Sequence, residues 1–262
     1  MPAADADLAR DSELLVRTVR EAGALALRMF STNLRQWTKT GSSPVSDADI
    51  AVDELIRSRL QPPTPDYGWL SEESVDDSTR LTRQRVWIVD PIDGTRAYLA
   101  GREDWSISAA LVEEGRPRIA AVFAPATDEF FFAARNGGAT RNNVAIAATT
   151  GTSCDLARMA GPSFLLDRMK AHSLTSASNY KIGSLALRIS RVAEGRLDAV
   201  FVGGNSRDWD LAAADLLVHE AGGTLTTLKG ESLTYNRPEV SHQVLTAAGC
   251  ERHAELIRHF RS

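Results

Sequence analysis

The sequence is poor in cysteine and has no long apolar segment. Its 262 residues include two cysteines, Cys154 and Cys250, which are too few for a disulfide framework and lack the spacing of a zinc site. No apolar run approaches the roughly 18 residues of a membrane helix. Met1 to Arg10 alternates acids and alanines, whereas a secretion signal begins basic and continues apolar. We therefore expect a cytoplasmic protein, in a reducing compartment, that has no membrane partner.

The sequence also lacks a net positive charge and histidines at paired spacing. The formal net charge is −4, which argues against nucleic acid as a partner. The chain has no Gly-x-Ser-x-Gly segment, which excludes one common class of serine hydrolase. The histidines show no metal-site spacing and are interpreted as surface or helix residues; they are His172, His219, His242, His253 and His259. Carboxylates remain as the side chains that carry chemistry.

Two carboxylates stand in the segment from Trp87 to Thr95, which reads Trp-Ile-Val-Asp-Pro-Ile-Asp-Gly-Thr. Val86 to Val89 predicts a short strand, and Pro91 forbids helix at the residue before it. We expect a rigid turn that directs Asp90 and Asp93 at one centre, because hard cations such as Mg²⁺ take oxygen ligands. An ordinary Asp-Gly turn after a strand would explain the last three residues without any ligand.

The rest of the chain predicts an α/β (α+β) protein. Apolar residues at helical spacing predict a helix from Leu8 to Met29, and another that ends at Leu60 with Ser46 or Asp47 as its N-cap. Three strand-like runs follow the central segment, at 105–112, 118–124 and 129–134, with a hairpin turn at 114–115. Residues 75–85 read as an exposed loop. Helices and strands alternate after about residue 141, and we divide the chain into 1–140 and 141–262.

Two further acids complete a candidate cluster. Glu72 lies in Leu-Ser-Glu-Glu, just before the central strand, where a pair of glutamates is usually a solvated loop. Asp210 lies in Trp-Asp-Leu-Ala-Ala, before an apolar helix, where an N-cap role would explain it without any metal. Either acid taken alone is therefore weak support for a metal site.

These motifs together resemble the inositol monophosphatase superfamily of Mg²⁺-dependent, lithium-sensitive phosphatases. The resemblance covers Ser-Pro-Val-Ser-Asp-Ala-Asp at 43–49, Leu-Ser-Glu-Glu at 70–73, the segment 87–95, and Trp-Asp-x-Ala-Ala with Glu-Ala-Gly-Gly between 209 and 223. Haloacid-dehalogenase phosphatases also carry Asp-Gly-Thr after a strand, but their nucleophilic Asp would fall at Pro91. The resemblance implies two or three Mg²⁺ ions and these ligands: side chains of Glu72, Asp90, Asp93 and Asp210, and the carbonyl of Ile92.

The resemblance also implies a mechanism and an architecture. Gly94 and Thr95 would cradle the phosphate, and Thr95, Asp49 and Glu72 would act on a metal-activated water that attacks phosphorus directly. The implied fold is a layered α/β/α/β/α sandwich, and a homodimer is common in the family. Because an empty anionic cluster is unfavourable, we expect Mg²⁺ to raise thermal stability.

The implied substrate is a small phosphorylated molecule. Lys39 and the residues around Ser43 and Asp49 bring the chain nearest to bacterial 3'(2'),5'-bisphosphate nucleotidases, which convert 3'-phosphoadenosine 5'-phosphate to AMP. Where inositol monophosphatases usually place a glutamate, this chain has Gly203, and it also departs from the nucleotidase pattern near 183–188 and 203–207. The candidate substrate-binding residues are Ser184, Arg188, Asn205 and Arg207. Phosphatases for inositol phosphate, histidinol phosphate or fructose 1,6-bisphosphate, and a non-catalytic phosphate-binding regulator, remain alternatives.

Overall fold

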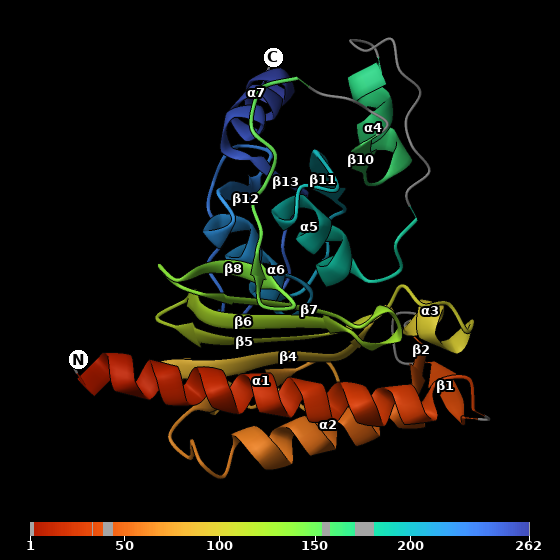
Figure 1. Ribbon diagram of the computed structural model, residues 1–262, viewed down its shortest axis with the longest axis vertical. Coiled ribbons are helices and arrows are strands. Elements are labelled where there is room, and N and C mark those ends of the chain that lie inside the picture. The colour runs from red at the N-terminus through yellow and green to blue at the C-terminus, as the bar shows by residue number, and fades with distance from the viewer. Residues whose placement is uncertain (1–2, 33, 39–43, 154–157, 171–180, 262) are drawn as a thin grey trace.

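The computed structural model describes residues 3–32, 34–38, 44–153, 158–170 and 181–261. The predictions for Lys39, Ser43 and His172 lie outside these residues. The described elements stack in five layers: two helices, a large sheet, two helices, a small sheet and two outer helices (Figure 1). This is the predicted α/β/α/β/α sandwich. Within the described residues, no helix combines the length and the apolar character that crossing a bilayer requires.

The first layer consists of α1 (Ala3–Met29) and α2 (Asp47–Leu60), which pack on one face of the large sheet. The apolar positions that predicted α1 are buried, including Leu15, Val19 and Ala26. The helix starts five residues earlier than Leu8, because the acid-and-alanine segment continues it. The N-cap of α2 is Ser46, as expected, and its hydroxyl accepts a hydrogen bond from the N–H of Ala48.

The large sheet has seven strands in chain order, and only its first pair is parallel. The 105–112, 118–124 and 129–134 runs pair antiparallel, as predicted. Glu114 and Gly115 form the hairpin turn, both with positive φ. The strands are β3 (Gly68–Ser71), β4 (Arg85–Asp93), β5 (Ser106–Glu113), β6 (Arg116–Ala124), β7 (Glu129–Ala134), β8 (Gly138–Arg141) and β9 (Val144–Ala145).

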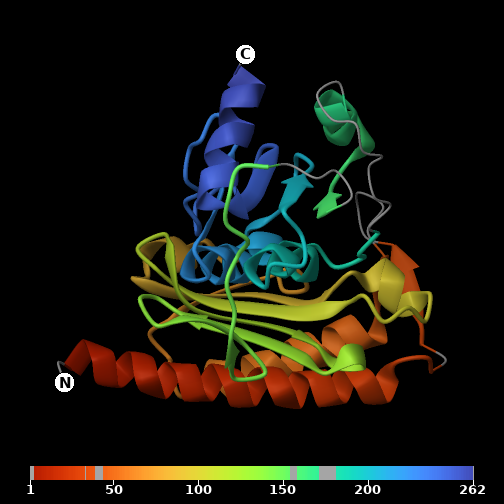
Figure 2. The same ribbon diagram turned by 45° about the horizontal axis from the view of Figure 1, so that its top comes forward.

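The middle layer, α5 (Leu185–Ala193) and α6 (Asp208–Glu220), separates the two sheets and shares one apolar core with both. Beyond it lies the four-stranded sheet β10 (Met159–Ala160), β11 (Ala199–Val202), β13 (Leu245–Gly249) and β12 (Gly223–Thr227), in that order. A smaller core joins this sheet to α4 (Ser163–Lys170) and α7 (Cys250–Arg261). Figure 2 shows α7 and α1 at opposite ends of the stack.

Short elements lie at the edge of the stack. The hairpin β1 (Gln36–Thr38) and β2 (Pro44–Ser46) precedes α2, and the single-turn helix α3 (Thr95–Leu99) follows β4. The 3₁₀ turns are η1 (Ser78–Thr82) and η2 (Pro125–Thr127). The proposed division near residue 141 falls just before β9, the last strand of the large sheet, and stays a prediction.

One interpretation from sequence holds only in part, and another is wrong. The 75–85 segment is not simply an exposed loop, because Arg80 within η1 is buried and its guanidinium binds Asp76, Asn236 and the carbonyl of Arg237. His242 is neither a surface nor a helix residue. It is 7% exposed in the loop before β13, and its Nε2 lies 2.7 Å from Asp208 Oδ1. Both Arg80 and His242 have partners far away in the sequence, so no local pattern predicts that they are buried.

Candidate active site

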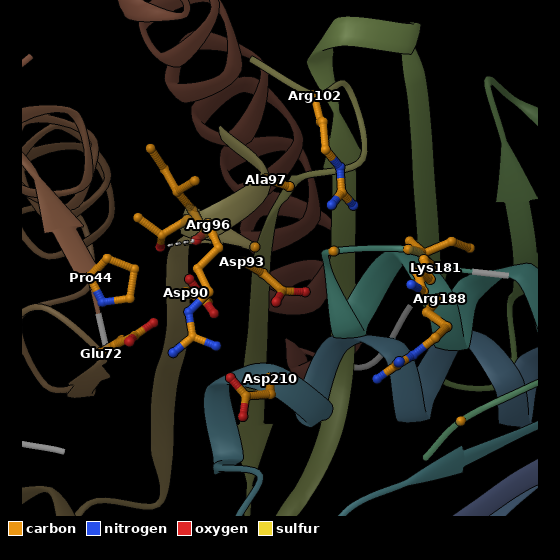
Figure 3. A pocket seen from close by; sticks show the side chains of 16 residues that line it. Pro44, Glu72, Asp90, Asp93, Arg96, Ala97, Arg102, Lys181, Arg188 and Asp210 are labelled. Atoms are coloured by element: carbon orange, nitrogen blue, oxygen red, sulfur yellow. Dashed lines mark hydrogen bonds between the residues drawn. The ribbon is translucent and has the colours of Figure 1, made fainter. Parts of the chain in front are cut away.

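One pocket collects most of the predicted site residues. It has a volume of about 480 Å³ and is lined by distant parts of the chain: by Glu72 just after β3, by β4 and by α3, and also by α5 and α6. Figure 3 shows the acids in the centre, with Glu72 and Pro44 on one side and Arg188 and Lys181 on the opposite side. The predicted residues that line it are Glu72, Asp90, Ile92, Asp93, Gly94, Thr95, Arg188 and Asp210.

A bulge in β4 brings Asp90 and Asp93 together. The sequence predicted a turn after Asp90, but the strand continues to Asp93. Asp90 pairs with Ser108 and Asp93 pairs with Ser106, so β4 contains one residue more than β5 over this interval. Side chains alternate along a regular strand, and residues three apart would point to opposite faces. The extra residue resets the alternation and places both carboxylates on the same side.

The first turn of α5 binds the Asp93 carboxylate. Asp93 Oδ2 accepts hydrogen bonds from the hydroxyl of Ser184 at 2.6 Å and from the N–H of Ala186 at 2.6 Å, while Oδ1 accepts from the N–H of Leu185 at 3.1 Å. A carboxylate is favoured here because the first N–H groups of a helix lack intrahelical partners. One predicted metal ligand therefore also joins β4 to α5.

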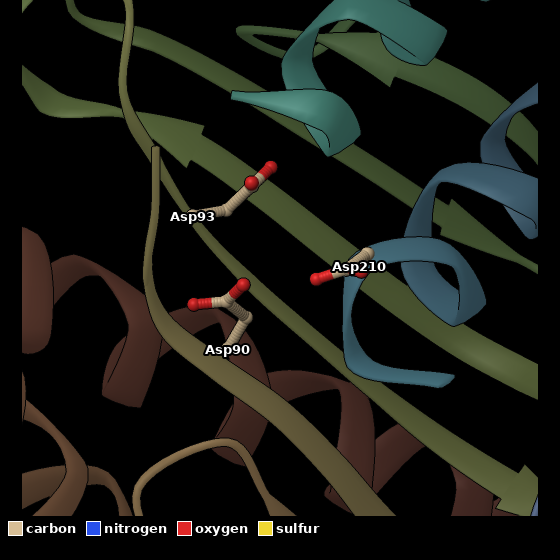
Figure 4. Close-up of side chains that lie close together, drawn as sticks. All are labelled: Asp90, Asp93 and Asp210. Carbon is tan, nitrogen blue, oxygen red and sulfur yellow. The ribbon is translucent and has the colours of Figure 1, made fainter. Parts of the chain in front are cut away.

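Asp210 reaches the same centre from α6. The helix begins at Asp208, so Asp210 is its third residue and not the N-cap that the sequence allowed. Its Oδ2 accepts a hydrogen bond from the N–H of Arg207 at 2.7 Å. Asp90, Asp93 and Asp210 each present one carboxylate oxygen within 4.8 Å of the others, as Figure 4 shows. Three carboxylates from two distant segments converge on one point.

The electrostatics of this cluster favour a bound cation. Burial raises the pKa of Asp90 well above its ordinary value, and the neighbouring charges of Glu72, Asp93 and Asp210 raise it further. Burial also raises the pKa of Asp210 well above its ordinary value, and raises that of Asp93. Asp90 Oδ1 is buried without a hydrogen-bond partner among the described residues. A divalent cation would satisfy that oxygen and offset the repulsion, so the residues present fit a metal site.

The predicted water-activating residues lie beside the cluster. Thr95 Oγ1 is 3.0 Å from Asp49 Oδ1 and 3.1 Å from the carbonyl oxygen of Ile92. Asp49 is buried behind Thr95, and its other oxygen accepts hydrogen bonds from the N–H and the hydroxyl of Ser46. Burial raises the pKa of Asp49, against the effect of these hydrogen bonds. Asp49 thus completes the capping box of α2 and orients the Thr95 hydroxyl.

Gly94 permits the close approach of the two walls. It has a φ of 93° and caps α3, and a Cβ at this position would lie 2.9 Å from the backbone N of Ser184. Only glycine combines this left-handed conformation with such a contact. Glu72 follows β3 and is held by its N–H, which donates to the carbonyl of Val89 at 3.3 Å.

The predicted substrate-binding residues separate into two groups. Arg188 lines the pocket from α5. Ser184 is fully buried, where it caps α5 and binds Asp93, so its hydroxyl is not presented to the pocket. Asn205 and Arg207 are exposed and are not among the residues that line this pocket, and Arg207 lies 3.6 Å from Glu239. The roles of these four residues remain predictions.

Sequence reasoning missed three cationic residues of the pocket. Arg96, Arg102 and Lys181 line it, but no short motif marks them, since isolated basic residues usually solvate a surface. The position of Ser184 was readable: a serine directly before an apolar helix is a typical N-cap. No local pattern indicates that the hydroxyl of Ser184 lies 2.8 Å from the hydroxyl of Ser106, at the start of β5.

The layered fold and the carboxylate cluster fit a metal-binding protein, and comparison with known proteins identifies its family. Residues 7–262 match the family model described as "Inositol monophosphatase family". The chain is 34% identical to inositol-1-monophosphatase of Rhizobium meliloti (83% of this chain, 85% of the relative) and 35% identical to histidinol-phosphatase of Mycobacterium tuberculosis (78% and 82%). It is also 34% identical to Nus factor SuhB of Xylella fastidiosa (83% and 82%).

Solved structures agree with these relatives. The inositol monophosphatase of Thermotoga maritima superposes with a TM-score of 0.82 at 25% identity, over 95% of this chain and 96% of that one. The extragenic suppressor protein SuhB of Bartonella henselae also gives 0.82, at 27% identity, over 95% and 98%. The chain belongs to the inositol monophosphatase family. It is accordingly a phosphoric monoester hydrolase of a metal-dependent family.

Proposed function

We propose that this chain hydrolyses small phosphate monoesters with two or three Mg²⁺ ions, by direct attack of water. The observation that carries the proposal is the convergence of Asp90, Asp93 and Asp210, with Asp90 Oδ1 buried and unpartnered in the described structure. With Glu72 and the carbonyl of Ile92 on the same pocket wall, these residues would hold the ions. Bound Mg²⁺ would lower the pKa of water and neutralise phosphate charge.

The chain's own groups orient the reactants. When Thr95 donates its single hydroxyl hydrogen to Asp49, its oxygen is left to accept a hydrogen bond from the attacking water, so the proton lost by the water can pass through the hydroxyl to the Asp49 carboxylate. Asp49 has a raised pKa, which makes it a better proton acceptor than an exposed carboxylate. Gly94 and Thr95 form the pocket wall at the start of α3, where they would hold the phosphate. No covalent enzyme intermediate is required.

The first candidate substrate is 3'-phosphoadenosine 5'-phosphate. The motif at 43–49 supports it, as does the presence of a basic residue, Arg188, in the pocket. Relatives named inositol-1-monophosphatase and histidinol-phosphatase support their substrates as alternatives. Relatives named Nus factor SuhB support a regulatory role as a candidate of another class. We further propose a homodimer in the cytoplasm, which size-exclusion chromatography and cell fractionation would check.

A substrate panel tests the proposal. The purified protein is assayed for phosphate release from 3'-phosphoadenosine 5'-phosphate, inositol 1-phosphate, histidinol phosphate and fructose 1,6-bisphosphate, with Mg²⁺, with EDTA, and with Mg²⁺ plus lithium. We expect turnover that requires Mg²⁺, is inhibited by lithium and is fastest on the first compound. Turnover of none would contradict catalysis and favour the regulatory role, whereas a preference for inositol 1-phosphate or histidinol phosphate would replace the proposed substrate.

A further inference from the structure

Arg188 is a cation of the pocket without a partner in the described structure. It lies on α5, one turn after Ser184, and its backbone N–H donates a hydrogen bond to the carbonyl of that serine. Long side chains on a helix point back toward its N-terminus, and here that direction leads into the pocket (Figure 3). Its Nε is buried and has no hydrogen-bond partner among the described residues.

The nearby acid does not fill this role. Asp93 attracts Arg188 electrostatically, but its oxygens already accept three hydrogen bonds from the first turn of α5. No ion pair within 4.0 Å joins Arg188 to any described carboxylate. Burial lowers the pKa of the guanidinium, yet arginine stays charged in proteins. A buried guanidinium N–H without an acceptor among the described residues marks a place for an external acceptor.

The surroundings of Arg188 indicate which part of a substrate it meets. Arg102 is paired with Asp104, and Arg96 also has an interaction partner. Lys181 is exposed at the same side of the pocket as Arg188, opposite Glu72. A phosphate held at the acidic centre and at Gly94 would leave this side of the pocket for the alcohol part of the ester.

We propose that Arg188 is a specificity-determining residue that binds a second anionic group, such as a second phosphate, on the alcohol part of the substrate. The inference rests on the proposed hydrolysis and names the substrate class: phosphate monoesters that carry a further anion. A planar guanidinium is suited to this contact, because it donates two parallel hydrogen bonds to a phosphate. Because the contact contributes binding energy to substrates that carry this anion, its loss lowers kcat/KM for those substrates.

Matched substrates test the inference. Two pairs differ by one phosphate each: adenosine 3',5'-bisphosphate with adenosine 3'-phosphate, and fructose 1,6-bisphosphate with fructose 1-phosphate. We expect the wild type to favour the doubly phosphorylated member of at least one pair by about 10-fold or more in kcat/KM. Arg188→Gln should lower kcat/KM for that member by about 10- to 100-fold, and leave the singly phosphorylated member within about threefold.

Two variants serve as controls. Arg188→Lys keeps the charge and should restore part of the preference. Arg258→Gln removes an exposed arginine of α7, outside the pocket, and should leave both members unchanged. Retained turnover of the singly phosphorylated member shows that Arg188→Gln is folded, and its melting temperature provides a second check.

The outcomes separate the two proposals. If the wild type hydrolyses no monoester, the proposed function fails, and the inference fails with it. If both members of each pair react equally well in the wild type, or if Arg188→Gln slows both members equally or neither, hydrolysis stands and the second-anion role of Arg188 is wrong. An equal loss on both members would instead assign Arg188 to the scissile phosphate.

Discussion

At the scale of single residues, Asp90 shows how much the site depends on a cation. Its side chain is 1% exposed, one oxygen has no partner in the described structure, and four nearby acids raise its pKa in addition to burial. Each of these features is unfavourable for an ionised carboxylate in the metal-free protein. The same features are favourable once a divalent cation is bound, because the acids then share its charge.

Asp90→Asn should therefore separate stability from function. We expect the variant in EDTA at pH 7 to be as stable as the wild type or more stable, by up to about 2 kcal/mol, because it removes a buried charge. Turnover should fall at least about 100-fold, since a metal ligand is lost. Urea unfolding and phosphate release measure the two effects, with exposed Glu54→Gln as control. A large loss of metal-free stability would contradict this view of Asp90.

His253 gives a pH dependence that is independent of the site. It lies on α7, 7% exposed, with Nε2 at 2.9 Å from Thr226 Oγ1. Burial lowers its pKa to about 4, with a smaller contribution from His219. The unfolded chain binds a proton below about pH 6.5, while the folded protein resists it until about pH 4. The associated stability is present above pH 6.5 and is lost as the pH falls toward 4.

His253→Gln should flatten this part of the stability curve. Glutamine keeps a donor for Thr226 but does not titrate. The wild type should lose free energy of unfolding on the order of 2–3 kcal/mol through His253 between pH 6.5 and 4, and the variant should not. Urea unfolding at several pH values checks this. Arg258→Gln, on the same helix, removes a group that does not titrate in this range, so it is the control and should keep the wild-type slope. Parallel curves for wild type and His253→Gln would contradict the prediction.

At the scale of elements, the bulge in β4 and the junction of α3 with α5 build the site. Beyond Val89, where the pairing with β3 ends, Pro91 needs no N–H partner on that side, so proline is tolerated within the strand. On the other side, the bulge against β5 turns both aspartates toward the pocket. Gly94 then lets the chain turn into α3 while touching Ser184 at the start of α5.

Gly94→Ala tests the junction, and Gly138→Ala is a matched control. Both glycines have positive φ, 93° and 78°, but a Cβ at Gly138 would meet nothing within 4 Å. Gly138→Ala should cost about 1–2 kcal/mol from the left-handed backbone alone. Gly94→Ala should cost at least about 1–2 kcal/mol more, since backbone atoms of residues 183 and 184 must move. Urea unfolding measures both, and equal losses would show that the close contact contributes nothing.

Much of this arrangement was predictable from sequence, for local reasons. The apolar spacing of α1, the N-cap of α2 and the hairpin at 114–115 depend on neighbours within a few residues, and each is found as expected. The sequence predicted a turn where the structure has a bulge in β4, because a proline between two aspartates is compatible with either. His242 and Arg80 were misread because their partners, Asp208 and Asn236, come from other parts of the chain. The role of Ser184 at Asp93 depends on tertiary packing in the same way.

At the scale of the whole molecule, the large sheet and the middle helical layer meet at the acidic centre. Asp90 and Asp93 come from the large sheet, whereas Asp210 comes from the middle layer, whose core is shared with the small sheet. Arg80 adds a second connection, because it joins η1 to the loop at 236–237. A cation held by Asp93 and Asp210 would therefore join segments that are more than a hundred residues apart in sequence.

Mg²⁺ should consequently stabilise the whole protein and not only the pocket. A ligand at about 100 times its Kd adds about 2.7 kcal/mol to folding stability, which for a chain of this size raises Tm by roughly 5–10 °C. NaCl at equal ionic strength controls for screening of surface charges. Asp210→Asn should lose most of the Mg²⁺-induced rise, although Asp90 and Asp93 remain. Hydrogen exchange should slow on binding both at the end of β4 and at the start of α6. Slowing at β4 alone, or a full rise in Tm in Asp210→Asn, would mean that the cation is held by β4 and does not join it to α6.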